Sequence, residues 1–92
     1  MSREKTKISP DKKGLVAREP NRFLVLHNDE VNSFDFVIQS LQDVCEHSYE
    51  QAEQCALITH FKGKCDIKKG EFEELKPMKD KLLNRKLTAT IE

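Results

Sequence analysis

The sequence contains no apolar run that approaches the roughly 20 residues needed to span a membrane as a helix. Its first twenty residues also lack the hydrophobic segment of a secretory signal peptide. These two absences predict a cytoplasmic protein with no membrane partner. The 92 residues, of which 37% are apolar and 35% charged, suit one small globular domain with a modest core.

Cysteine is scarce, and the three residues Cys45, Cys55 and Cys65 form an odd number at ten-residue spacing. Without a secretion signal, we expect reduced thiols rather than a disulfide framework. Cys55, His60 and Cys65 match the last three ligands of a zinc knuckle, but Ala52 occupies the position of the first ligand. Because a structural zinc site needs four ligands, we predict no metal and no cofactor.

Lysine and arginine are absent from residues 23–61, a segment that holds seven acidic residues: Asp29, Glu30, Asp35, Asp43, Glu46, Glu50 and Glu53. The flanking segments carry all sixteen basic residues, so the neutral chain is strongly polarised along its length. A negative field favours a cationic partner and repels phosphate groups. The lysines after residue 61 alternate with acidic residues, which is typical of a solvated face. A nucleic-acid or ribosome-associated domain is therefore the weaker alternative, and we predict no nucleic-acid partner.

The turn after the first apolar run contains no glycine. Residues 23–26 are apolar, and Asn28, Asp29 and Glu30 follow closely as three successive polar acceptors. An ordinary turn held by Asn or Asp side chains is one interpretation. Within this acidic segment, the oxygens of Asn28 and Asp29 are also suited to an ammonium group or a cation. We therefore treat the turn as a candidate binding site.

The first half of the chain divides at about residue 21. Residues 1–21 hold six basic and three acidic residues, two prolines and one apolar cluster, which predicts a flexible N-terminal extension. Residues 22–92 form the predicted folded domain, which begins with a strand at residues 23–26. A helix is predicted over residues 33–46, with Asn32 as its N-cap and Asp35 in a capping-box position.

The second helix is predicted over residues 49–61, because Ser48 and Gln51 form a capping box and Gly63 supplies a C-terminal stop. A short strand is expected at residues 65–67.

The last third of the chain predicts a turn at residues 68–70, then a helix, then a strand at residues 87–91. Pro77 must lie in the first turn of this helix or kink it. The apolar face of the helix comprises Phe72, Leu75, Met78, Leu82 and Leu83. The predicted fold class is α+β in the order β-α-α-β-α-β, with a small three-stranded antiparallel sheet packed on one side against three helices.

Several of these segments resemble the ClpS adaptor family. The matching residues are Val-Leu-His-Asn-Asp-Glu at 25–30, Phe-Val at 36–37, Thr-His-Phe-Lys-Gly-Lys at 59–64 and Thr-Ala-Thr-Ile-Glu at 88–92. The resemblance extends over residues 23–92. It implies a non-enzymatic, monomeric adaptor that binds proteins with N-terminal Phe, Tyr, Trp or Leu. It also implies delivery of these proteins to the N-terminal domain of a ClpA- or ClpC-type AAA+ unfoldase coupled to the ClpP peptidase.

The resemblance also assigns roles to individual residues. It implies that Asn28, Asp29 and His60 hold the free α-amino group, with Glu30 and Asn32 in support. The implied apolar side-chain pocket comprises Phe34, Val37, Ala56, Thr59 and Leu87. The chemistry agrees, since an ammonium group has three donors and these side chains offer acceptors, provided that the imidazole is neutral.

The chain departs from the family pattern in two places. Family members commonly have methionine at the positions of Phe34 and Ala56, so the selectivity of the pocket stays open. The segment between His60 and Leu87 is also shorter, which leaves the identity of the unfoldase open. The main alternative is a ClpS-like modulator of an unfoldase that does not read N-terminal residues. An enzyme is a poorer interpretation, because no Ser or Cys nucleophile has a histidine beside it by local spacing.

Overall fold

A computed structural model describes residues 22–92, and the predicted extension at residues 1–21 lies outside the described part. The elements follow the predicted order and are β1 (Arg22–His27), α1 (Phe34–Cys45), α2 (Tyr49–Lys62), β2 (Lys64–Gly70), α3 (Phe72–Asn84) and β3 (Thr88–Ile91). The predicted β-α-α-β-α-β order is therefore confirmed. No helix within residues 22–92 has the length and apolar character that a membrane crossing requires.

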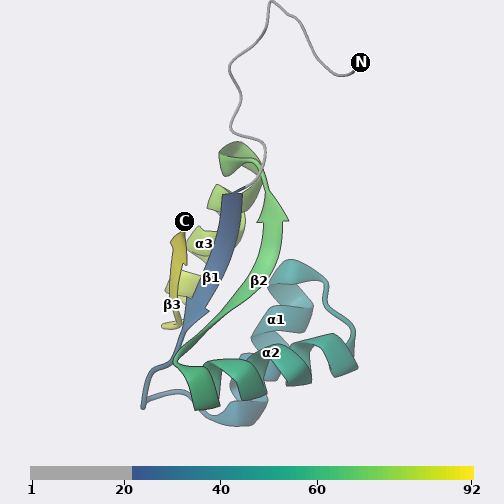
Figure 1. Ribbon diagram of the computed structural model, residues 1–92, viewed down its shortest axis with the longest axis vertical. Coiled ribbons are helices and arrows are strands. Elements are labelled where there is room, and N and C mark those ends of the chain that lie inside the picture. Colours follow the sequence, from purple (N-terminus) through teal and green to yellow (C-terminus); the bar gives the residue numbers. More distant parts are fainter. Residues whose placement is uncertain (1–21) are drawn as a thin grey trace, which may run out of the picture.

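The three strands form one antiparallel sheet in the order β2-β1-β3, so the first strand of the chain occupies its centre. Figure 1 shows α3 behind β1 and β3, with the α1–α2 pair beside β2. Alternate residues of the strands and the inner faces of all three helices form a single core. Its fully buried large side chains include Leu24, Leu26, Leu41, Leu75 and Leu82. This core fixes the end of β1 against the end of α2.

The prediction of a turn at residues 68–70 is wrong, because β2 continues to Gly70. Leu24 pairs with Lys68 and Val25 with Asp66, so Ile67 is an extra residue in a β-bulge. The bulge lets the lysine-rich segment stay paired with β1 while Ile67 remains buried in the core. Pairing with the central strand thus outweighs the local turn preference of Lys-Lys-Gly.

The N-cap of α1 is Ser33 and not Asn32, which corrects the sequence prediction. The Ser33 hydroxyl accepts a hydrogen bond from the backbone N–H of Phe36 at 3.1 Å. The Asn32 side chain is engaged elsewhere, since its amide donates to Asp29 and to the backbone carbonyl of Lys86. Two neighbouring residues could cap this helix, and a tertiary contact decides between them.

Both predicted ends of α2 are confirmed. The Ser48 hydroxyl accepts from the backbone N–H of Gln51 at 3.1 Å. At the other end, Gly63 has φ +95°, and its N–H donates to the carbonyl of Thr59 at 2.9 Å. A left-handed residue at this position is strained unless it is glycine, so Gly63 both ends the helix and sets the direction of β2.

The third helix runs from Phe72 to Asn84, so Pro77 lies in its second turn rather than its first. The predicted apolar face is only partly buried. Leu75 and Leu82 are fully buried, whereas Phe72 and Leu83 are exposed. The amphipathic pattern therefore identified the helix but overstated the width of its buried face.

Candidate functional site

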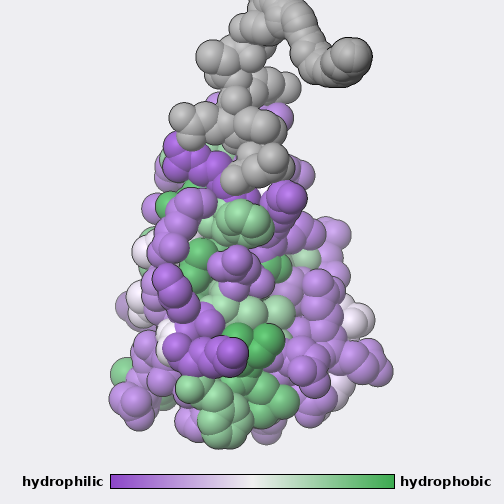
Figure 2. Space-filling model, viewed as in Figure 1, coloured by the Kyte–Doolittle hydropathy of each residue, from purple (hydrophilic) through white to green (hydrophobic). Residues whose placement is uncertain are grey.

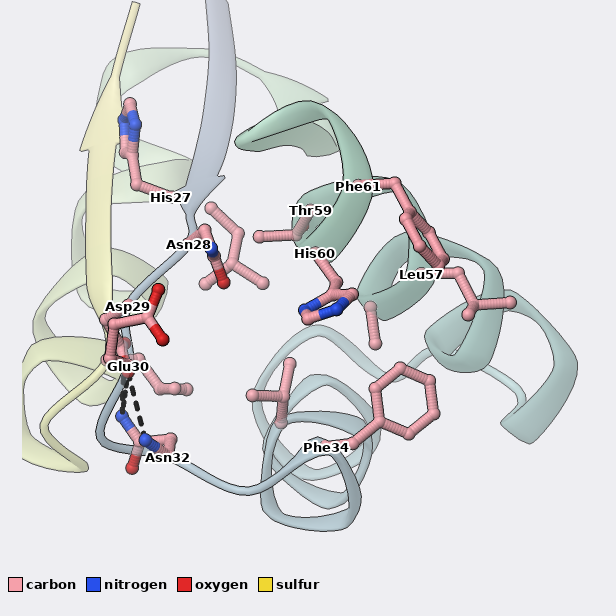
Figure 3. Close-up of a pocket in the computed structure, with 14 residues that line it drawn as sticks. His27, Asn28, Asp29, Glu30, Asn32, Phe34, Leu57, Thr59, His60 and Phe61 are labelled. Atoms are coloured by element: carbon pink, nitrogen blue, oxygen red, sulfur yellow. Dashed lines mark hydrogen bonds between the residues drawn. The ribbon is translucent and has the colours of Figure 1, made fainter.

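A pocket of about 490 Å³ opens where the end of β1, the start of α1 and the end of α2 meet, next to the residue that precedes β3. All ten site residues predicted from the sequence line this pocket: Asn28, Asp29, Glu30, Asn32, Phe34, Val37, Ala56, Thr59, His60 and Leu87. Figure 3 shows them around one cavity, supplied by four separate segments of the chain. The fold thus brings together residues that are up to 59 positions apart.

The turn after β1 is organised by the Asp29 carboxylate (dashed lines in Figure 3). Its Oδ1 accepts from the backbone N–H groups of Val31 and Asn32, at 2.9 and 3.0 Å. The Asn32 side-chain amide donates to Oδ1 and Oδ2 of the same carboxylate, at 3.2 and 3.1 Å. The turn interpretation is therefore correct for Asp29, and these bonds hold its carboxylate at the pocket wall.

The surroundings of the Asp29 carboxyl group favour its ionised form. Partial burial opposes ionisation, but the hydrogen bonds from the N–H groups of Asn32 and Val31 and from the Asn32 amide outweigh it, so the pKa lies below its usual value of 3.8. The negative charge is thus present at neutral pH. It sits beside the exposed Glu30 carboxylate in a segment without basic residues, which favours a cation in the pocket.

Two hydrogen bonds fix the turn to other elements. The backbone N–H of Asn28 donates to the carbonyl of Gly63 at 2.9 Å, which joins the end of β1 to the end of α2. The side-chain amide of Asn32 donates to the carbonyl of Lys86 at 2.8 Å. Lys86 has φ +71° and directly precedes the pocket residue Leu87. These two bonds therefore fix the turn after β1 relative to the end of α2 and to the segment before β3.

The polar side of the pocket faces the His60 ring. In Figure 3 the side chains of Asn28 and His60 enter the cavity from opposite walls, one from the end of β1 and one from the last turn of α2. Both residues are exposed, so a ligand can reach them. An amide oxygen, a carboxylate and a neutral imidazole nitrogen are three acceptors, which is the number an ammonium group can use.

The deep wall of the pocket is apolar. Ala56, Thr59 and Leu87 are buried, and Val37 of α1 lies beside them as a half-buried side chain. The Thr59 hydroxyl donates to the carbonyl of Cys55 at 2.8 Å, so its hydrogen-bonding demand is met within α2. The wall can therefore contact an apolar group without leaving a buried donor unsatisfied.

Four lining residues were not predicted as site residues: Leu26, His27, Leu57 and Phe61. The His27 ring nitrogen Nε2 is 2.8 Å from Oγ1 of Thr90, so this ring is engaged with β3. Leu57, His60 and Phe61 have the i, i+3, i+4 spacing of one helix face, and that spacing could have identified the two apolar residues from the sequence.

The cysteines belong to the core. All three are buried free thiols, and the Cys65 thiol donates to the backbone carbonyl of Asp66 at 3.5 Å. Burial raises the pKa of Cys65 to about 12, and burial raises that of Cys45 to about 11 despite the charge of Lys68. Within residues 22–92, no group of three or more His, Cys, Asp or Glu side chains could hold a metal ion.

The chain is similar in sequence to known proteins. Residues 17–90 match the family described as ATP-dependent Clp protease adaptor protein ClpS. The ATP-dependent Clp protease adapter protein ClpS of Oleidesulfovibrio alaskensis is 44% identical over 62 residues, which cover 64% of this chain and 60% of that protein. The protein of the same name from Edwardsiella ictaluri is 31% identical over 72 residues, covering 75% of this chain and 68% of that protein. The chain thus spans between three fifths and about two thirds of these relatives.

The fold is also shared with a solved structure, that of Agrobacterium tumefaciens ClpS2 bound to L-phenylalaninamide. The two have a TM-score of 0.69 at 22% sequence identity, over 82% of this chain and 98% of ClpS2. At this identity the likeness shows a common fold, three helices against a three-stranded antiparallel sheet.

Proposed function

This chain belongs to the ClpS family of ATP-dependent Clp protease adaptor proteins, and we propose that it binds substrate proteins by a bulky apolar N-terminal residue. The substrates begin with Phe, Tyr, Trp or Leu, and the adaptor hands them to a Clp AAA+ unfoldase coupled to the ClpP peptidase. The chain itself cleaves nothing in this scheme. It acts by binding, and the unfoldase and peptidase supply the chemistry.

The observation that carries the proposal is the two-sided pocket. Acceptors from Asn28, Asp29 and His60 line one side, and the apolar wall at Val37, Ala56 and Leu87 lines the other. An N-terminal residue carries a cationic α-ammonium group and a side chain on the same carbon, so it matches both sides at once. The L-phenylalaninamide bound by ClpS2 has these two groups, which supports the same use of the pocket here.

The geometry supports a role for each residue. The ammonium group donates to Asn28 Oδ1, to the remaining lone pair of Asp29 Oδ2 and to a His60 ring nitrogen. Phe34 and Thr59 complete the side-chain pocket. Glu30 adds negative charge, and Asn32 holds the Asp29 carboxylate in place. Charge-assisted hydrogen bonds of this kind are the stronger class, so loss of one should be measurable.

The partner is the N-terminal domain of a ClpA- or ClpC-type unfoldase, and the adaptor acts as a monomer. The segment between His60 and Leu87, in which the sequence departs from the family pattern, contributes to this partner surface. The cytoplasmic location expected from the sequence stays a prediction.

One observation favours a second candidate function. The Asp29 carboxylate already accepts four hydrogen bonds within its own turn. A ClpS-like modulator that binds the unfoldase without reading N-terminal residues would need this turn only as a structural element. The two functions differ in one property, the dependence of peptide binding on a free α-amino group.

Peptide binding provides the test. A peptide beginning with Phe should bind, and the same peptide with an acetylated N-terminus should bind at least about 30-fold more weakly, since about 2 kcal/mol of charge-assisted hydrogen bonding is lost. Asn28→Ala should have a similar effect. This variant removes only the exposed amide and keeps the backbone N–H that donates to Gly63. Asp29→Ala should weaken binding too, but it also removes the hydrogen bonds of the turn.

Tyr49→Ala is the matched control, because Tyr49 is an exposed residue at the far end of α2 and does not line the pocket. It should bind the Phe peptide as the wild type does. Equal binding of the free and acetylated peptides by the wild type would exclude recognition of N-terminal residues and favour the modulator.

A further inference from the structure

Phe61 is the most exposed aromatic side chain of the described residues, with 77% of its surface accessible, and it lies at the mouth of the pocket. Its ring packs edge-on against the His60 ring, with centroids 4.9 Å apart. Keeping a large apolar ring in water has an energetic cost, so an exposed ring beside a binding pocket is a candidate ligand contact.

Phe61 is not isolated. In Figure 3 its ring, the Leu57 side chain and the Phe34 ring lie together on the side of the cavity away from Asn28 and Asp29. Figure 2 shows hydrophobic residues on the surface at the lower end of the molecule, where α2 and β2 meet in Figure 1. We define Leu57 and Phe61 as the apolar rim. Phe34 lies beside this rim and belongs to the pocket for the first side chain.

The pocket has more room than a single residue requires. Pockets that enclose a drug-sized ligand have volumes of about 300–1,000 Å³, and this pocket has about 490 Å³. Ala56 contributes to this space, because its small side chain stands in the buried wall one position before Leu57. Once one side chain occupies the deep wall, the apolar rim is still free to contact the next residue.

We propose that the apolar rim is a second subsite, which takes the side chain of the second residue of the bound peptide and favours an apolar residue there. The inference rests on the proposed function, since the α-amino group and the first side chain must be bound as described. His60 contacts both the amino group and the Phe61 ring, so it places the second residue next to Phe61. The first side chain determines whether a peptide binds, and the second side chain changes how tightly it binds.

Two peptides that begin Phe-Leu and Phe-Ser and are otherwise identical test the subsite. Wild-type protein should bind the Phe-Leu peptide about tenfold more tightly, which corresponds to about 1.4 kcal/mol. Phe61→Ala should bind both peptides with the affinity that the wild type has for Phe-Ser. Phe61→Tyr keeps the ring and should restore the preference for Leu.

Tyr49→Ala serves again as the control, since it removes an exposed ring from the same helix at a distance from the pocket. It should keep the full tenfold preference. All variants should retain the requirement for a free α-amino group, which shows that the first site is intact.

Three results would overturn the subsite. Equal affinity of the wild type for Phe-Leu and Phe-Ser, with binding still dependent on the free amino group, would refute the second subsite and leave the proposed function standing. A preference that survives in Phe61→Ala would refute the role of the rim. Failure to bind any free-amino peptide would refute both proposals.

Discussion

Single side chains define the polarity of the site. The Asp29 carboxylate can serve the turn and the pocket together, because three of its four hydrogen bonds within the turn end on Oδ1 and only one ends on Oδ2, which leaves a lone pair of Oδ2 for a ligand. Its lowered pKa keeps the charge in place well into acidic conditions. The contribution of this carboxylate to stability is fully present above its ordinary pKa of 3.8 and is lost progressively as the pH falls below 3.8 through the lowered pKa.

Ala56 should set the upper limit on the size of the first side chain. Ala56→Met fills part of the buried apolar wall, so peptides beginning with Trp should lose more affinity than peptides beginning with Leu. A change of this size in an apolar pocket alters binding by about 1–3 kcal/mol. Dissociation constants for the two peptides measure the effect, with the thermal stability of the variant as a control on folding. Equal losses for both peptides would show that residue 56 does not limit the pocket.

At the scale of the elements, the end of α2 is the part of the fold on which the site depends most. Gly63 ends the helix, its carbonyl accepts from Asn28, and His60 lies one turn before it. A β-carbon at Gly63 would meet no atom within 4 Å, so any cost of substitution comes from the backbone conformation at φ +95°.

Gly63→Ala should lower the free energy of unfolding by about 1–2 kcal/mol, because an alanine is strained in the left-handed region. Gly63→Asn should cost less, since asparagine tolerates this region better. Urea denaturation of the three proteins provides the comparison. An alanine variant as stable as the wild type would mean that the helix end can adopt another conformation.

The helices and strands differ in how well their ends could be predicted from the sequence. The ends of α2 could be predicted because their hydrogen bonds join residues close in sequence. These residues are Ser48 and Gln51 at the start and Gly63 at the end. The N-cap of α1 could not be predicted in this way, because Asn32 donates to Lys86, a residue 54 positions away. The extension of β2 depends on its register with β1, and a bulge in that register has no signature in the sequence of β2 alone.

The residues of the candidate site were found by two different routes. Asn28, Asp29 and His60 were polar residues at element ends and matched a family motif, and the structure places them around one pocket. Leu57 and Phe61 were missed because apolar residues on a helix are usually assigned to the core. Their spacing places them on the helix face of His60, and the arrangement of α2 against α1 shows that this face borders the pocket.

For the whole molecule, the family match begins at residue 17, so residues 1–16 lie outside the matched region. The composition of residues 1–21 predicts an extension, and the resemblance to the ClpS family implies that such an extension engages the unfoldase. A random coil of this length would span roughly 25 Å. Deletion of residues 1–16 should leave peptide affinity and thermal stability unchanged but slow the degradation of an N-terminal Phe reporter by the reconstituted unfoldase and peptidase. Degradation at the full rate would show that handover depends on the folded domain alone.

The assembly of the pocket from four distant segments has a thermodynamic consequence. A partly opened chain, in which the end of β1 has left the end of α2, has no pocket and cannot hold a peptide. A ligand that binds only the closed form stabilises it by mass action, by about 2.7 kcal/mol at a hundredfold excess over the dissociation constant. Under the proposed function, the loaded adaptor is then more stable against unfolding than the free adaptor, so cargo would protect its carrier from the unfoldase.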